Sequence, residues 1–198
     1  MSGERSADVL DFESRRRSRA QAMAVEALLD AGIELLHEST YDALTLDAVS
    51  AKAGLSAATA TELFASTDDL IIGIYLRRIR GVALCTTAPH GSIEQVAAQL
   101  SRIMLAVAEE PAVATACAAV FLGNSQTASR AQENVTSEIH RLIATAVGPG
   151  SWPEVVTTLE LIFSGALIQA AAGTMTFQRA AERVETAVSL IIQGVPQQ

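Results

Sequence analysis

Apolar side chains recur along this chain with the period of an α-helix. Within residues 16–38, Met23, Ala27, Ala31 and Leu35 stand four positions apart, and this spacing puts them on one helix face. No segment alternates apolar and polar residues in the way that a strand does. Further helices are expected over residues 46–53, 57–63, 67–84, 92–109, 111–123, 126–147, 152–173 and 176–194. The pattern therefore predicts an all-α fold of about nine helices.

Capping residues and turn formers mark where these helices begin and end. Thr45 and Ser56 each precede a short helical segment and suit the N-cap position. Gly54 lies between the two segments and can take the positive φ that ends a helix. Residues 86–91 (TTAPHG) are dense in turn formers and form the clearest linker. Residues 1–14 are polar and acidic without a sustained period, which predicts a flexible arm.

Residues 44–64, LTLDAVSAKAGLSAATATELF, have the spacing of a helix-turn-helix unit. Two short helices that meet at a steep angle need a flexible residue in the turn, which Gly54 supplies. They also need small or apolar residues at their contact, such as Val49 and Ala60. Such a unit can present its second helix to the major groove of DNA. An ordinary corner between two helices has the same pattern, so the spacing alone leaves both interpretations open.

Composition narrows the class of protein. Of the 198 residues 49% are hydrophobic, 18% are charged and 36 are alanine, and the net charge is −8. These values exclude collagen-like and disordered chains. No apolar run reaches the length of a membrane span without polar interruption, and the N-terminus lacks a signal-peptide core. Two cysteines make no disulfide framework. We therefore expect a soluble cytoplasmic protein with no membrane contact.

Several spaced residues make the helix-turn-helix reading more specific. Residues 28–70 resemble the DNA-binding domain of the TetR (tetracycline-repressor) family. The matching residues are Leu28, Leu29, Asp30, Ala31, Glu34, Leu35, Leu36, Tyr41, Thr45, Asp47, Ala48, Val49, Ala53, Gly54, Leu55, Ser56, Thr59, Phe64 and Leu70. The resemblance implies a homodimeric transcription regulator, most often a repressor, that binds an inverted-repeat operator. It also implies a second domain that binds a small molecule.

The chain departs from the family pattern at positions that usually contact DNA. The family favours glycine where Thr40 stands, tyrosine where Thr61 stands and lysine where Thr67 stands. The expected recognition helix, residues 57–62, contains no basic residue. Its readout is then limited to methyl contacts with thymine and hydrogen bonds from hydroxyl groups.

Positive charge is concentrated before this unit instead. Residues 14–19 (SRRRSR) carry four arginines and no acidic residue. A solvated helix start would look the same, but beside a helix-turn-helix we expect contacts with phosphate. The predicted DNA-contacting residues are Arg15, Arg16, Arg17, Arg19, Thr45, Ser56, Ala57, Ala58, Thr59, Thr61 and Thr67.

The second half of the chain predicts apolar binding and dimerisation. Charged residues between 81 and 171 are sparse, well below the roughly 25% of typical domains. Helices this apolar bury more than one face, around a cavity or against a partner. The candidate ligand-lining residues are Met104, Val107, Cys117, Phe121, Asn124, Ile139, Ile143, Phe163 and Leu167, with His140 and Gln169 as further polar candidates.

Small residues at helical spacing mark the candidate dimer interface on the last two helices. Two such pairs related by a two-fold axis would form a four-helix bundle. The predicted interface residues are Leu161, Gly165, Ile168, Val184, Val188 and Ile191.

The sequence carries no signal for catalysis. It has no phosphate-binding glycine loop, no nucleophile elbow and no metal-ligand spacing, so we expect neither an enzyme nor a cofactor. We divide the chain into a flexible arm (1–14), a helix-turn-helix DNA-binding domain (15–66) and a ligand-binding and dimerisation domain (67–198). The alternative function is a dimeric binding module for apolar molecules whose DNA-binding domain is degenerate.

Overall fold

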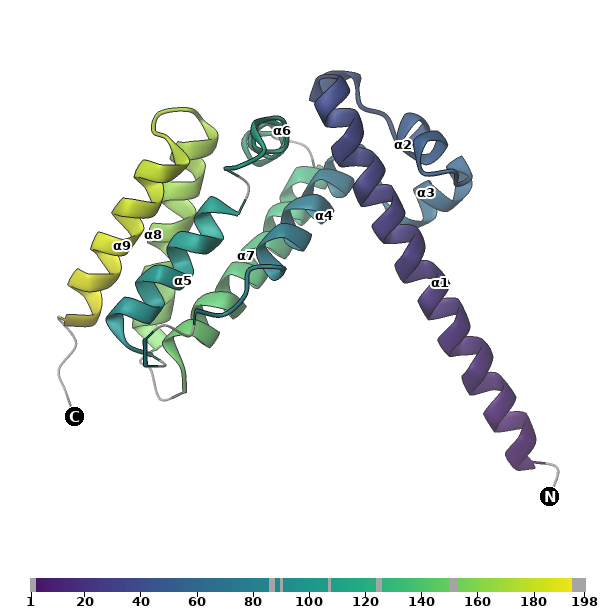
Figure 1. The fold of residues 1–198 in the computed structure, drawn as a ribbon, viewed down its shortest axis with the longest axis horizontal. Coiled ribbons are helices and arrows are strands. Elements are labelled where there is room, and N and C mark those ends of the chain that lie inside the picture. The colour runs from purple at the N-terminus through teal and green to yellow at the C-terminus, as the bar shows by residue number, and fades with distance from the viewer. Residues whose placement is uncertain are drawn as a thin grey trace.

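The computed structural model describes residues 3–85, 88–89, 91–106, 108–123, 126–149 and 153–193, with the side chains of residues 3–15 and 126–132 outside the description. These residues form nine α-helices, one 3-10 turn and no strand, as the apolar period predicts (Figure 1). The elements are α1 (Gly3–Glu38), η1 (Tyr41–Ala43), α2 (Leu46–Lys52), α3 (Ala57–Leu63), α4 (Thr67–Arg80), α5 (Ile93–Leu105), α6 (Pro111–Leu122), α7 (Gln126–Val147), α8 (Pro153–Ala171) and α9 (Phe177–Gln193).

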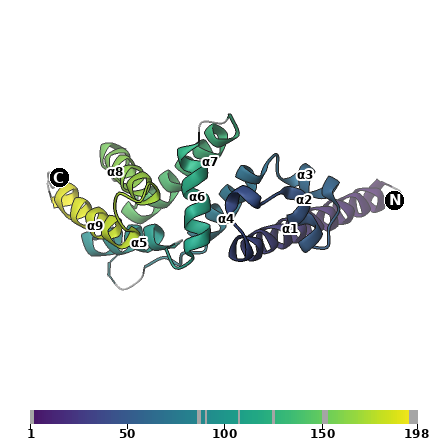
Figure 2. The same cartoon turned by 90° about the horizontal axis from the view of Figure 1, so that it is seen from above.

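The first helix is longer than the sequence pattern indicated. It spans 36 residues from Gly3, so residues 3–14, which we predicted to be an arm without regular structure, are helical. Residues 4–31 contain no proline or glycine, so none of them removes a helical hydrogen bond or strongly disfavours the helix. The N-terminal half of α1 projects away from the rest of the molecule (Figures 1 and 2).

The helix-turn-helix is held on a small core formed with α1 and α4. Val49 and Ala60 are completely buried, and Phe64 is buried behind α3. Gly73 on α4 makes room for this packing, since a Cβ there would lie 3.0 Å from the Phe64 ring and 3.1 Å from Leu29. The close approach fixes the position of α3 relative to α4.

The remaining helices form a second unit that α4 joins to the first. α9 packs beside α5 and α8, while α7 packs against α4 and α8, and α6 crosses between the two units (Figures 1 and 2). Phe163 on α8 and Val188 on α9 are completely buried in this core. We call the unit made by α5–α9 the body, and the unit made by the C-terminal half of α1, η1, α2 and α3 the head.

One helix of the described residues, α8, is long and apolar enough to cross a membrane by length and composition alone, although only 33% of it is buried. Our criterion of an unbroken apolar run had passed over it, because Glu160 and the threonines before it interrupt the run. Its inner face packs on α9, α6 and α7. Its outer face leaves Leu161 73% and Ile168 50% exposed.

Candidate functional site

The helix-turn-helix is shaped by local hydrogen bonds. The Thr45 hydroxyl accepts from the Ala48 N–H at 3.2 Å and starts α2. Gly54, with φ of +70°, reverses the chain after α2. The Ser56 hydroxyl then accepts from the Thr59 N–H at 3.0 Å and starts α3. The two caps and the glycine occupy the places that the sequence predicts.

The outer face of α3 is neutral apart from one carboxylate. Ala57, Ala58, Thr61 and Glu62 are exposed, whereas Thr59 is half-buried. The Thr61 hydroxyl donates within its own helix, to the carbonyl groups of Ala57 and Ala58 at 3.1 and 3.0 Å. Its single proton is therefore engaged, and the methyl group is what Thr61 offers to a base edge.

Ser56 and Thr59 share a different arrangement. Their hydroxyl groups lie 2.8 Å apart, and either can be the donor. If Ser56 donates while it caps α3, the proton of Thr59 is left for an acceptor on DNA. With this assignment of the protons, Thr59 can donate to an acceptor on DNA, whereas Thr61 cannot.

Lys52, the cationic residue nearest the turn, forms ion pairs with acidic residues of α1. Lys52 pairs with Glu38 at 2.8 Å and with Glu34 at 3.4 Å, and the hydrogen bond with Glu38 is the main cause of its raised pKa. Thr67, where the family favours lysine, is half-buried in the first turn of α4. The adjacent Asp68 accepts from the Tyr41 hydroxyl.

The arginines lie on the projecting part of α1. Arg16, Arg17 and Arg19 are exposed, and the Arg15 side chain lies outside the description. Arg16 and Arg19, three positions apart on one helix, share a face. The apolar pattern predicts a first helix that begins at about residue 16, which puts these arginines before or at its start. The structure puts them within it, so their spacing is set by helical geometry.

A small apolar pocket lies in the body between α6, α7 and α8. Its volume is about 190 Å³, and its walls are Phe121, Val135, Thr136, Ile139, Ser164, Leu167 and Ile168. Three predicted ligand-lining residues, Phe121, Ile139 and Leu167, thus come together at one site. No charged side chain lines it.

Comparison with known proteins decides the family. Residues 28–74 match the model for bacterial regulatory proteins of the tetR family. An uncharacterized HTH-type transcriptional regulator of Mycobacterium tuberculosis is 38% identical over 184 residues, which cover 92% of this chain and 86% of that protein. The chain belongs to the TetR family. It is accordingly a DNA-binding transcriptional regulator and not an enzyme.

Solved structures show the same fold. A TetR transcriptional regulator from Rhodococcus sp. RHA1 superposes with a TM-score of 0.71 at 21% identity, over 89% of this chain and all of that one. The regulator FadR from Bacillus subtilis, solved with stearoyl-CoA, has a TM-score of 0.50 at 14% identity, over 86% of this chain and 99% of that one. The order of helices in this TetR-family protein is therefore shared well beyond the head.

Salt bridges tie α4 to both units of the TetR-family fold. Arg77 pairs with Glu26 at 2.9 Å and with Asp30 at 2.7 Å, both on α1. Arg78 pairs with Glu110 at the start of α6. α4 is thus linked by ion pairs both to α1 in the head and to the start of α6 in the body.

Other predicted ligand-lining residues belong to the packed core of the body. Met104, Cys117, Ile143 and Phe163 are each no more than 2% exposed, and none lines the pocket. Burial raises the pKa of the Cys117 thiol to about 12, which keeps it protonated and unreactive. Val107 and Asn124 lie outside the described residues. No group of His, Cys, Asp or Glu in the described part of the chain is arranged to hold a metal ion.

The polar candidates of the body lie away from the pocket. His140 is exposed and its Nδ1 lies 2.8 Å from Glu160, and Gln169 is exposed on α8. Sequence reasoning missed the pocket residues Val135, Thr136 and Ser164. Helical spacing from Ile139 and Leu167 was the available signal, because residues three or four positions apart share a face.

The candidate dimer face divides between α8 and α9. Leu161 and Ile168 are exposed on the outer side of α8, and a Cβ added at Gly165 would meet nothing within 4 Å. Val184 and Val188 are 1% and 0% exposed inside the protomer, so our assignment of these two to the dimer interface is wrong. Their face of α9 packs on the protomer's own α5 and α8. On α9, Ile191 is half-buried and Leu190 is 68% exposed.

Proposed function

We propose that this TetR-family regulator is a homodimeric repressor of an inverted-repeat operator, released by a small and mostly apolar ligand bound in the body. The observation that carries the proposal is the position of α4. Gly73 of this helix contacts the head through Phe64 and Leu29. Two residues later, Tyr75 packs edge-on against Phe121 of the pocket wall.

The coupling follows from this shared helix. A ligand that occupies the pocket favours a position of α6 and α7 that accommodates it. Since α6 is tied to Arg78 and α4 packs against α7, the preferred position of α4 changes with it. The two heads of a dimer then match the half-site spacing of the operator less well, and affinity falls.

The outer face of α8 supports the homodimer. Exposed leucine and isoleucine side chains around an open glycine permit close approach of a second copy. Together with Leu190 on α9, this surface would complete a four-helix bundle across a two-fold axis. The operator would then be an inverted repeat, because the protein's symmetry is mirrored in its site.

The neutral pocket supports an apolar ligand. A charged ligand would lose its hydration there without gaining a partner. The structural neighbour FadR was solved with stearoyl-CoA, which supports the view that this fold accepts lipid-like molecules. Because such a regulator acts on the chromosome, we place it in the cytoplasm.

A second candidate function is a dimeric binding module whose head has lost its operator. The neutral outer face of α3 and the pairing of Lys52 with Glu34 and Glu38 favour it. Under this alternative, DNA binding is weak and lacks sequence preference, while ligand binding persists.

Binding to DNA flanking the protein's own gene separates the two functions. Labelled fragments are titrated at two salt concentrations, with random DNA as competitor, before and after addition of a lipophile extract of the host. The proposal expects a protected inverted repeat, a preference over random DNA and release by the extract. Equal affinity for flanking and random DNA would contradict operator binding, and unchanged operator affinity with the extract would contradict ligand control.

A further inference from the structure

Tyr75 on α4 carries a buried hydroxyl that has no hydrogen-bond partner among the described residues. The side chain is 0% exposed. Its ring packs edge-on against Phe121, with centroids 5.2 Å apart and planes at 87°. A buried hydroxyl without a partner loses its hydration and gains nothing in return. In native proteins most buried hydroxyl groups have a hydrogen-bond partner, so the Tyr75 hydroxyl is an exception.

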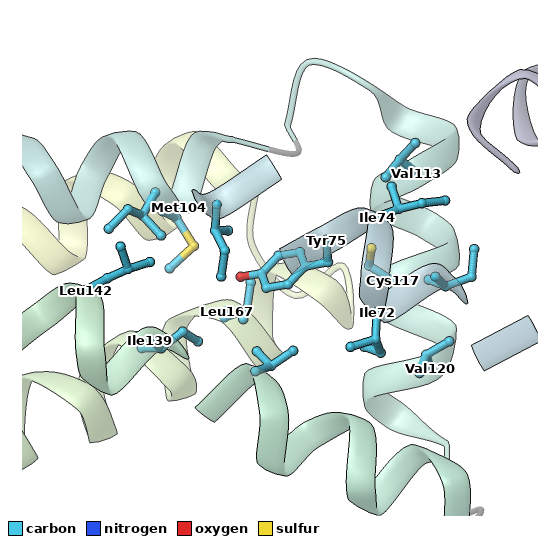
Figure 3. Packing of buried hydrophobic residues seen from close by; sticks show 14 of the residues in the cluster. Ile72, Ile74, Tyr75, Met104, Val113, Cys117, Val120, Ile139, Leu142 and Leu167 are labelled. Atoms are coloured by element: carbon cyan, nitrogen blue, oxygen red, sulfur yellow. The ribbon is translucent and has the colours of Figure 1, made fainter. Parts of the chain in front are cut away.

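The surroundings of the hydroxyl are apolar. Its oxygen points away from Val113 and Cys117 and toward Met104 and Leu167 (Figure 3). Desolvation raises the pKa of Tyr75 far above its ordinary value. The group therefore stays protonated and is available as a donor.

The Tyr75 side chain lies next to two walls of the apolar pocket, although Tyr75 itself is not among the residues that line it. Phe121, which the Tyr75 ring touches, is a wall of that pocket, and so is Leu167, toward which the hydroxyl points. A ligand that displaces the Leu167 side chain would bring an acceptor to the hydroxyl. The pocket walls offer hydroxyl groups at Thr136 and Ser164 but no cation.

We propose that Tyr75 donates a hydrogen bond to the carbonyl oxygen of a small, neutral, apolar ligand, such as a ketone or an ester. The inference rests on the proposed function and specifies its ligand. A carbonyl accepts the bond without bringing a charge into the pocket, whereas a carboxylate would lie there without a counterion. The volume of about 190 Å³ slightly exceeds the roughly 150 Å³ cavity that holds benzene, so the ligand is of the size of one substituted ring.

The position of Tyr75 also links the ligand to the head. Tyr75 lies two residues after Gly73, which contacts Phe64, and next to Ile74, which would be 3.2 Å from a Cβ at Gly32 on α1. A hydrogen bond at Tyr75 thus acts on the helix that positions the helix-turn-helix.

Two compounds of the same shape test the proposal. Acetophenone carries a carbonyl oxygen where α-methylstyrene carries a methylene group. We measure the affinity of the full-length protein for each by calorimetry, in the parent and in Tyr75→Phe. The parent should bind acetophenone about tenfold more tightly, the size of one neutral hydrogen bond. Tyr75→Phe should lose this preference and bind α-methylstyrene at least as tightly as acetophenone, because the carbonyl group then loses its hydration without gaining a partner.

Two control variants test whether the compounds bind in the pocket and whether Tyr75 is the donor. Tyr41→Phe removes the other tyrosine hydroxyl of the chain, in the head, and should keep the tenfold preference. Thr136→Trp fills the mouth of the pocket and should abolish binding of both compounds. In the parent, the carbonyl stretch of bound acetophenone should also move to lower frequency than in an apolar solvent, a readout that needs no variant.

Several results would overturn the inference. These are an equal affinity of the parent for both compounds, no binding of either at millimolar concentration, a preference that survives Tyr75→Phe, or binding that survives Thr136→Trp. Operator affinity is measured in the same samples. A Tyr75-dependent preference without any change in operator affinity would leave the hydrogen bond standing and count against ligand control.

Discussion

The head and the body satisfy their polar groups differently. In the head, the hydroxyls of Thr45 and Ser56 cap helices and that of Thr61 bonds within α3. In and around the body, Tyr75 and Gln99 keep buried polar atoms without partners among the described residues, and α8 keeps an exposed apolar face. In the head these hydroxyl groups are thus hydrogen-bonded within the fold, but the recognition helix offers no positive charge to DNA. The body has unpaired polar atoms that a ligand could bind and an exposed apolar face that a second copy of the chain could cover.

The two faces of the α8–α9 pair give the sharpest contrast. Val188→Asp puts an unpaired charge into the core of the body, and we expect the free energy of unfolding to fall by about 3–5 kcal/mol. Leu161→Asp changes a side chain that is 73% exposed. It should leave the protomer folded and convert the proposed dimer to a monomer in sedimentation.

Urea unfolding and sedimentation at micromolar concentration check both variants. A Leu161→Asp protein that remains dimeric would move the interface away from α8. A Val188→Asp protein of parental stability would contradict the burial of α9 against the body.

Two helical glycines provide a second contrast between head and body. Gly73→Val forces new atoms against Phe64 and Leu29, and we expect a loss of about 1–3 kcal/mol in stability, with weakened DNA binding. Gly165→Val meets open space and should change the stability of the protomer by less than about 0.5 kcal/mol. The two stabilities are measured in the Leu161→Asp background, so that dimerisation does not contribute, whereas DNA binding is measured in the parent background. Equal losses at the two positions would contradict the tight contact at Gly73.

Substitutions at Thr59 and Thr61 of the recognition helix distinguish a hydroxyl group that can contact a base from one that is bonded within the helix. Thr59→Ala removes a hydroxyl that can face a base edge, and it should cost about 1 kcal/mol for each half-site of the operator but little on random DNA. Thr61→Ala removes a hydroxyl that is already bonded to Ala57 and Ala58 and should have the smaller effect. Competition titrations with operator and random DNA decide the order. A larger loss of preference from Thr61→Ala would reverse this assignment.

Alkaline pH gives the smallest effect, confined to the head. Burial, together with a hydrogen bond to Asp68, raises the pKa of Tyr41 to about 12 from 10.0. Because the folded state holds the proton more tightly, this contribution to stability is complete below pH 10 and is lost between about pH 10 and 12. Tyr41→Phe should lose stability less steeply over that range in urea titrations. A parental slope would show that Tyr41 does not titrate differently on folding.

The sequence predicted those features of the fold that depend on interactions between residues close together in the chain. The caps at Thr45 and Ser56 and the turn at Gly54 follow from hydrogen bonds within a few residues, and the sequence predicted them correctly. It did not predict the start of α1 at Gly3 or the ends of α4 at Arg80 and of α5 at Leu105. The sequence did not predict the ion pairs between residues on different helices. The Lys52 pairs with Glu34 and Glu38 cross from α2 to α1, and no spacing within α2 signals them.

Periodicity shows that a face is buried but not by what. The apolar faces of α8 and α9 had the same pattern, yet α9 buries Val184 and Val188 within its own protomer while α8 leaves Leu161 exposed. In the same way, the apolar residues of the body predicted a pocket but did not separate its walls from the core. Phe121, Ile139 and Leu167 proved to be walls, whereas Met104 and Phe163 pack in the interior.

The salt dependence of operator binding tests most directly the hypothesis that this protein, whose recognition helix is neutral, depends on the arginines of α1 to bind DNA. The slope of log affinity against log salt is measured by fluorescence anisotropy for the parent and for a variant in which Arg15, Arg16, Arg17 and Arg19 are all alanine. The account predicts weaker binding to every sequence and a slope reduced by roughly one unit for each lost phosphate contact. An unchanged slope and affinity at moderate salt would contradict it.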